Sequence, residues 1–159
     1  GMVFERGCQT LMTIATVMLE FQTRTRCEKF MNVFKRTTLF TDTDARARFR
    51  DDFVEFNEGT PDIQMSSLFP CISYQFRHSP VGFVGPVHCT SIPTWVFILA
   101  GQMEVVLQDG SSRKFMPGES FLAADALPAG VEFDETVHGH YSRQAGFEPL
   151  VTLFIHEDM

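Results

Sequence analysis

Three histidines are the side chains of this chain best suited to chemistry: His88, and further along His138 and His140. Imidazole is a good ligand for zinc, iron, copper and nickel, and its ordinary pKa near neutrality also suits proton transfer. His138 and His140 are separated by one residue, so they would point to the same face of a β-strand. The pattern predicts either a transition-metal site, if the three imidazoles converge, or hydrogen-bonded histidines at the rim of a barrel.

Residues with smaller polar side chains follow His88 in the same alternation. Thr90 and Thr94 are predicted on the same face as His88, and Val96 continues that face toward a core. The guanidinium of Arg77 either reaches this end of the strands, where it would hold a carboxylate, or is solvated at the rim. These residues together predict a ligand pocket lined by Thr90, Thr94, Val96 and Arg77.

The same alternation places Trp95 and Phe97 on the opposite face, against a second layer or a partner chain. Cys89 also points away from its neighbour His88, so a Cys–His nucleophile is not expected. We therefore interpret Cys89 as a packed thiol.

The elements that would position these side chains are strands. Two apolar runs, 95–99 and 103–107, meet at Ala100-Gly101, and Asp109-Gly110 is a strong hairpin signal before a short strand at 113–115. Residues 87–122 are accordingly predicted to be a meander of antiparallel strands. Residues 28–40 look extended, whereas 45–56 fits either a helix or a strand. Short strands at regular turn spacing predict an all-β sandwich or barrel.

Composition narrows the class of protein. The chain has 159 residues, 44% of them apolar, and a net charge of −7. The negative charge argues against nucleic acid and anionic membrane surfaces as partners, and no apolar run approaches the ~20 residues of a membrane span. The four cysteines are widely spaced and suggest neither a zinc knuckle nor a disulfide framework, so a cytoplasmic location is expected.

One spacing resembles a known family. Gly82, five residues, His88, and then Gly101 match the frame of the first motif of the cupin superfamily, with Thr90 and Thr94 where that motif carries its second histidine and its glutamate. A second, stretched motif starts at Gly118, turns at 128–130 and places His140 at its histidine position. The segments FMPGESFLAAD and GHYSR resemble small single-domain cupins.

The resemblance implies an all-β cupin-type double-stranded β-helix, that is, a jelly-roll barrel. The domain would span residues 31–159, with residues 1–30 an N-terminal strand or arm and Gly1 a tag scar. It also implies a homodimer, to which the arm would add a strand. Cupin metal sites resemble a cage of three histidines and one glutamate that holds iron, manganese, nickel or zinc. Here His88 and His140 match it, and His138 is the candidate third ligand.

Two functions follow from this pattern. The first is a small-molecule-binding cupin whose pocket lies inside the barrel and holds no firmly bound cofactor. The second is a metal-dependent enzyme, such as an oxygenase, isomerase or lyase, that acts on a small organic acid. The second requires His138 to join His88 and His140.

Overall fold

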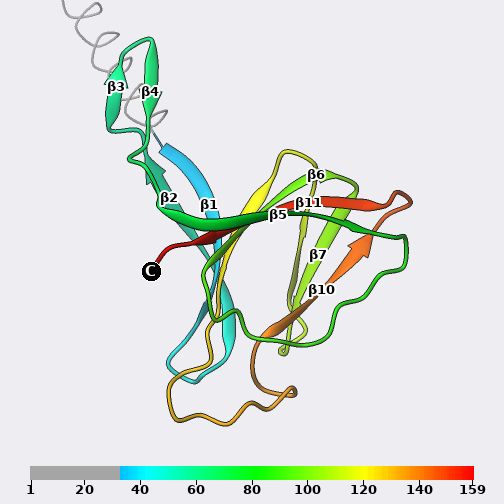
Figure 1. Cartoon of the computed structure of the whole chain (residues 1–159). Helices are drawn as coiled ribbons and strands as arrows, with labels where there is room; N and C mark the ends of the chain where they lie inside the picture. The colour runs from blue at the N-terminus through cyan, green and yellow to red at the C-terminus, as the bar shows by residue number, and fades with distance from the viewer. Residues whose placement is uncertain (1–32) are drawn as a thin grey trace, which may run out of the picture. The chain divides into compact units, whose positions relative to one another are not determined.

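The computed structural model describes residues 33–159, so the segment predicted as an N-terminal arm lies outside the described residues. All regular elements described are strands, which confirms the all-β prediction (Figure 1). In chain order they are β1 Val33–Thr41, β2 Ala47–Glu55, β3 Glu58–Thr60, β4 Ile63–Met65, β5 Cys71–Ser79, β6 Thr94–Ala100, β7 Gln102–Leu107, β8 Ser112–Phe115, β9 Ser120–Ala124, β10 His140–Ala145 and β11 Leu150–Glu157.

The described chain divides into two compact units. Residues 33–34 and 54–67 belong to the first, in which β3 and β4 form an antiparallel hairpin. Residues 35–53 and 68–159 form the second, which is the barrel. The domain boundary at residue 31 stays a prediction. No helix in the described part of the chain is long and apolar enough to cross a membrane.

The barrel consists of two sheets, and from β6 onward the chain crosses repeatedly from one to the other. One sheet has the order β2-β1-β9-β6-β11-β5, and the other has the order β10-β7-β8. Isolated bridges from Val84 to Arg143 and from His88 to His140 add residues 84–88 to the free edge of β10. The order β9-β6-β11-β5 opposite β8-β7-β10 and residues 84–88 is that of a jelly roll, so the fold is the predicted cupin-type double-stranded β-helix.

The core lies between the inner faces of the two sheets. Val96 and Ile98 of β6 point into it, as their alternation predicts, and both are almost completely buried. Each such side chain contributes about 1.5–3 kcal/mol of hydrophobic stabilisation relative to an exposed position. The other members of this cluster are Leu39, Ala47, Met103, Val105, Leu107, Phe115, Phe121, Ala123 and Leu150.

The predicted meander over residues 87–122 is wrong in its pairing. β7 and β8 do pair, across the Asp109-Gly110 turn, but β6 pairs with β9 and β11 in the other sheet. At Gly101 the chain crosses from one sheet to the other. Gly101 has φ = 71°, and a Cβ there would lie 2.4 Å from the Pro149 carbonyl oxygen. A glycine is therefore needed at this corner because of sterics, not because of a hairpin turn.

The ambiguous segment 45–56 is a strand. Residues Ala47–Glu55 form β2, in which Phe49 packs against the core and Phe53 is exposed. The spacing of its phenylalanines imitates a helix, but the segment belongs to a sheet in which β2 pairs beside β1. Tertiary pairing overrides the local pattern here.

Candidate functional site

A cavity of about 290 Å³ opens within the barrel unit, between the inner faces of the two sheets. The structure brings to it most of the residues proposed from the sequence, namely Arg77, His88, Thr90, Thr94, Val96 and His140. Arg77 and His88 are exposed and mark its mouth, whereas Thr94, Val96 and His140 are buried and mark its floor.

Backbone pairing sets the positions of His88 and His140. The amide of each donates to the carbonyl of the other at 2.9 Å, and the two ring centroids are 4.5 Å apart. Gly139 makes this approach possible, because a Cβ there would lie 2.2 Å from the His88 carbonyl oxygen. A glycine with φ = 71° beside His140 is therefore part of how the site is built.

The ring of His140 is held by a buried carboxylate. Its Nδ1 lies 2.7 Å from Oδ2 of Asp125, and the two side chains are 5% and 0% exposed. The second carboxylate oxygen accepts a hydrogen bond from the Thr90 amide at 3.3 Å. A carboxylate accepts hydrogen bonds, so Nδ1 of His140 carries the proton, and Nε2 is left for a ligand.

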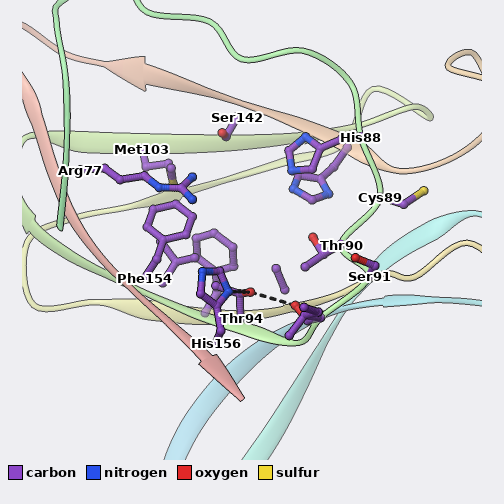
Figure 2. A pocket seen from close by; sticks show the side chains of 15 residues that line it. Arg77, His88, Cys89, Thr90, Ser91, Thr94, Met103, Ser142, Phe154 and His156 are labelled. Carbon is purple, nitrogen blue, oxygen red and sulfur yellow. Dashed lines mark hydrogen bonds between the residues drawn. The ribbon is translucent and has the colours of Figure 1, made fainter. Parts of the chain in front are cut away.

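The other two imidazoles of the cavity are anchored through the same nitrogen. Nδ1 of His88 lies 3.0 Å from the Pro86 carbonyl oxygen, which can only accept. The Thr94 hydroxyl donates its one proton to the Ile92 carbonyl, so it must accept from Nδ1 of His156 at 2.9 Å (Figure 2). No hydrogen bond within residues 33–159 occupies Nε2 of His88, His140 or His156.

His138 is not part of this arrangement. It does not line the cavity, and its Nδ1 accepts a hydrogen bond from the Asp134 amide at 2.9 Å. Unbroken alternation from His138 to His140 would have placed both imidazoles on one face of a strand. β10 begins at His140, however, and the positive φ of Gly139 breaks the alternation between the two histidines.

The donor set does not fit the metal cage that the fold family implies. Within residues 33–159, no three His, Cys, Asp or Glu side chains are grouped closely enough to hold a metal ion. Thr94, at the position of the cage glutamate, has its hydroxyl committed to Ile92 and His156. Asp125 supplies a carboxylate, but it orients His140 through Nδ1. We derive no chemical step through a metal.

Arg77 brings a cationic group to the mouth of the cavity. Its guanidinium carbon lies 3.9 Å from the centroid of the Phe154 ring, and Nε donates to Oε1 of Gln75 at 2.8 Å. Figure 2 shows Arg77 and Phe154 together at one end of the cavity, with His88 and Thr90 at the other. No carboxylate of residues 33–159 pairs with this guanidinium, so its terminal nitrogens are available for a bidentate contact with an acid.

Cys89 is at the cavity wall but is not activated. Burial, and next the negative charge of Asp125, raise the pKa of its thiol. A raised pKa keeps the sulfur protonated near neutrality, and the thiol is a poor nucleophile compared with the thiolate. The chemistry of the cavity therefore consists of hydrogen bonding and charge from Arg77, the three imidazoles and hydroxyl groups.

Sequence reasoning missed Asp125, Phe154 and His156. Both Phe154 and His156 share the inward parity of Thr152 on β11, which is 2% exposed, so alternation along the last strand would have identified them. Asp125 is the last residue of the segment FLAAD. A carboxylate directly after an apolar strand was the sequence feature that could have identified it. Its pairing with His140 brings together the end of β9 and the start of β10, 15 residues apart in sequence.

Comparison with known proteins adds one structural likeness. No protein-family model and no curated protein matches the chain. Among solved structures, the cupin domain of Schizosaccharomyces pombe Cnp3 is similar over 80% of this chain and 85% of that chain, with 15% identical residues and a TM-score of 0.40. The cupin-type fold described here is established by the strand order and connections of this chain.

Proposed function

We propose that this protein binds a small organic acid in the cavity of its barrel. The observation that carries the proposal is the guanidinium of Arg77, which has no carboxylate partner among the described residues and lies at the mouth of a cavity that also contains three imidazoles. A carboxylate can accept two parallel hydrogen bonds from a guanidinium. The imidazoles can form hydrogen bonds with further oxygen atoms of the same ligand.

The size and lining of the cavity support a compact ligand. A volume of about 290 Å³ is at the lower end of the range for small-molecule pockets, roughly 300–1,000 Å³. Apolar walls formed by Val96, Met103, Phe121 and Phe154 would take the carbon skeleton of such a molecule. The acid group would lie toward Arg77, and hydroxyl groups of the ligand would donate to the free Nε2 atoms of the imidazoles.

Two of the imidazoles are held in place before a ligand binds. Because Nδ1 of His140 is fixed by Asp125, and Nδ1 of His156 by Thr94, both rings hold one orientation before a ligand arrives. Pre-organisation lowers the entropy lost on binding and so strengthens affinity without additional contacts. Asp125 acts as a positioning residue, since it works through His140.

The test is calorimetric titration with a panel of small mono- and dicarboxylic acids, each beside its neutral amide. We expect at least one acid to bind, its amide to bind at least tenfold more weakly, and Arg77→Gln to weaken the acid by about 10–100-fold, the loss typical of a charged hydrogen bond. Arg50→Gln is the matched control, because Arg50 also lies over a phenylalanine ring but does not line the cavity.

Two results would overturn the proposal. One is that no acid of the panel binds in the millimolar range. The other is that acids bind equally to the wild type, Arg77→Gln and Arg50→Gln proteins, which would place the site elsewhere. Binding should also raise the melting temperature, since a ligand that binds only the native state stabilises it.

A further inference from the structure

The three imidazoles of the cavity share one tautomer. Nδ1 of His140 faces a carboxylate, and Nδ1 of His88 faces a backbone carbonyl, so both nitrogens must donate. Nδ1 of His156 faces the Thr94 hydroxyl, whose own proton is already donated to a carbonyl. A neutral imidazole carries a single proton on its two nitrogens, so Nε2 of each ring presents a lone pair and can only accept.

A fourth histidine shows that the tautomer is set by the surroundings of each ring. Nδ1 of His138 accepts a hydrogen bond from the Asp134 amide at 2.9 Å, so the proton of this ring is on Nε2. His138 does not line the cavity. The histidines of the described chain that do line it are those whose Nε2 accepts.

The two ends of the cavity have opposite hydrogen-bonding character. Figure 2 shows Arg77 at one end and His88 at the other. The guanidinium has only donors. At the far end, the rings of His88 and His140 lie with their centroids 4.5 Å apart, and Nε2 of both accepts. The hydroxyl groups of the wall donate or accept as a ligand requires, so they do not select between ligands; they belong to Thr90, Ser91 and Ser142.

This polarity decides which group of a ligand can lie beside the imidazoles. A keto oxygen or a second carboxylate would turn its lone pairs toward the lone pairs of Nε2, whereas a hydroxyl group has a proton to donate. Once a ligand fills the cavity, water cannot replace a missing donor at His140, which is 4% exposed. A site built to hydrogen-bond a hydroxyl group rejects analogues that lack it far more strongly than an apolar pocket rejects a change in size.

We propose that the ligand of this cavity is a monocarboxylic acid with two adjacent hydroxyl groups, and that the cavity rejects keto acids and dicarboxylic acids of the same length. Arg77 takes the carboxylate of this ligand, so its identity rests on the function proposed above. Two adjacent hydroxyl groups match the two neighbouring acceptors of His88 and His140. Nε2 of His156 would accept from a third hydroxyl group. Small sugar acids belong to this chemical class.

The test is calorimetric titration of the full chain at about pH 8, above the ordinary imidazole pKa of about 6.5. Threonate and gluconate carry adjacent hydroxyl groups, whereas succinate and adipate have the same numbers of carbon atoms and a second carboxylate. Butyrate and 2-ketobutyrate complete the shorter series. We expect threonate or gluconate to bind at least about tenfold more tightly than each matched acid, because every unpaired buried acceptor weakens binding.

The same titrations separate this inference from the function on which it rests. Matched acids that bind as tightly as the hydroxy acids, and that lose affinity in Arg77→Gln, would contradict the need for hydroxyl groups while leaving the acid-binding function intact. If no acid binds, both proposals fail together.

His88→Gln tests the acceptor directly, because the side-chain amide of glutamine also has donors. His88 lies at the exposed mouth of the cavity, so the fold should tolerate the change. We expect the preference for the hydroxy acid over its matched dicarboxylate to fall about fivefold or more, since the dicarboxylate gains a hydrogen bond. His78→Gln is the matched control, because His78 is an exposed histidine of β5 that does not line the cavity. An unchanged preference in His88→Gln, or an equal change in His78→Gln, would overturn the proposal.

Nitrogen-15 NMR of the imidazole rings tests the tautomers without any ligand. At about pH 8, the spectra should show the proton on Nδ1 of the three cavity rings, His88, His140 and His156. His138 is the internal reference and should carry its proton on Nε2. A proton on Nε2 of His88 or His140 would sink the proposal whatever the titrations show, because that end of the cavity would then donate.

Discussion

The two faces of β5, β6 and β11 have opposite characters. The inner face carries Thr94, His156 and Arg77 among apolar residues, whereas the outward face carries mainly aromatic and aliphatic side chains. Burial alone would give the reverse distribution, with polar groups outside. Buried polar groups and exposed apolar patches are the informative exceptions to that rule. The inner face therefore suits the small organic acid proposed above.

The polar groups of the inner face are also hydrogen-bonded to one another, which offsets the free-energy cost of burying them. The Thr90 amide donates a hydrogen bond to Asp125. The Thr94 hydroxyl donates to the Ile92 carbonyl and accepts from His156. On the outward side of the same strands, Trp95 is buried and donates to Glu157, whereas Tyr74 and Phe76 are 68% and 64% exposed.

Two adjacent residues provide the largest test of this comparison. Ile98 is 1% exposed on the inner face of β6, and Leu99 is 48% exposed on its outer face. Ile98→Ala should lower the free energy of unfolding by about 2–5 kcal/mol at every protein concentration, because it leaves a core cavity. Leu99→Ala should cost less than about 1 kcal/mol, because about half of this side chain is already exposed. Urea denaturation at two protein concentrations measures both, and equal losses would contradict the contrast.

The buried carboxylate of the inner face provides the next test. Asp125→Ala leaves Nδ1 of His140 and the Thr90 amide without their acceptor in a buried place, so we expect a loss of about 1–3 kcal/mol of stability. Asp158→Ala, an exposed aspartate near the end of the chain, is the control and should change stability by less than about 0.5 kcal/mol. Thermal and urea unfolding report the difference, and equal effects in both variants would show that Asp125 has no structural part.

The smallest expected effect concerns the other sheet and its dependence on pH. Hydrogen bonds from Ser112 and then from Arg143 hold the pKa of Glu104 below its usual range. A carboxyl group with a lowered pKa in the folded state stabilises the protein above the usual glutamate pKa of about 4.3, and this contribution is lost as the pH falls below it. Arg143 is about half exposed, so solvent screening limits the contribution to about 1 kcal/mol or less.

Unfolding measured from pH 7 down to pH 3 tests this expectation. Glu104→Gln should make stability fall less steeply with acid than it does in the wild type. Glu119→Gln, an exposed glutamate of the β8–β9 turn, is the comparison. An unchanged acid dependence in Glu104→Gln would show that the pair with Arg143 adds nothing to the sheet.

Much of the inner face could be predicted because it depends on local rules. Alternation along a strand places Thr94 and Val96 on one side and Trp95 on the other whatever the strand pairs with. The spacing from Gly82 through His88 to Gly101 resembled a cupin motif without any knowledge of contacts. The same parity argument, applied to β11, would have added Phe154 and His156 to the cavity.

Other features depend on contacts between segments distant in sequence, and local patterns do not contain them. Where the chain crosses between sheets, Gly101 is needed because the Pro149 carbonyl leaves no room for a Cβ, and no nearby residue reveals this. His138 lies outside the cavity because Gly139, which packs against the His88 backbone, breaks the alternation between His138 and His140. The orientation of the His140 ring depends on Asp125, which lies 15 residues earlier, directly after β9.

Strand character, the all-β class and the identity of the inward side chains thus follow from the order of residue types, because a strand alternates with a fixed period. Which strands become neighbours is a question of long-range pairing and sterics, and only the folded barrel answers it. That pairing selects His156 in place of His138 for the cavity. It also sets the rows of Tyr74 and Phe76 beside those of β11 and β6, so that scattered apolar residues become one surface.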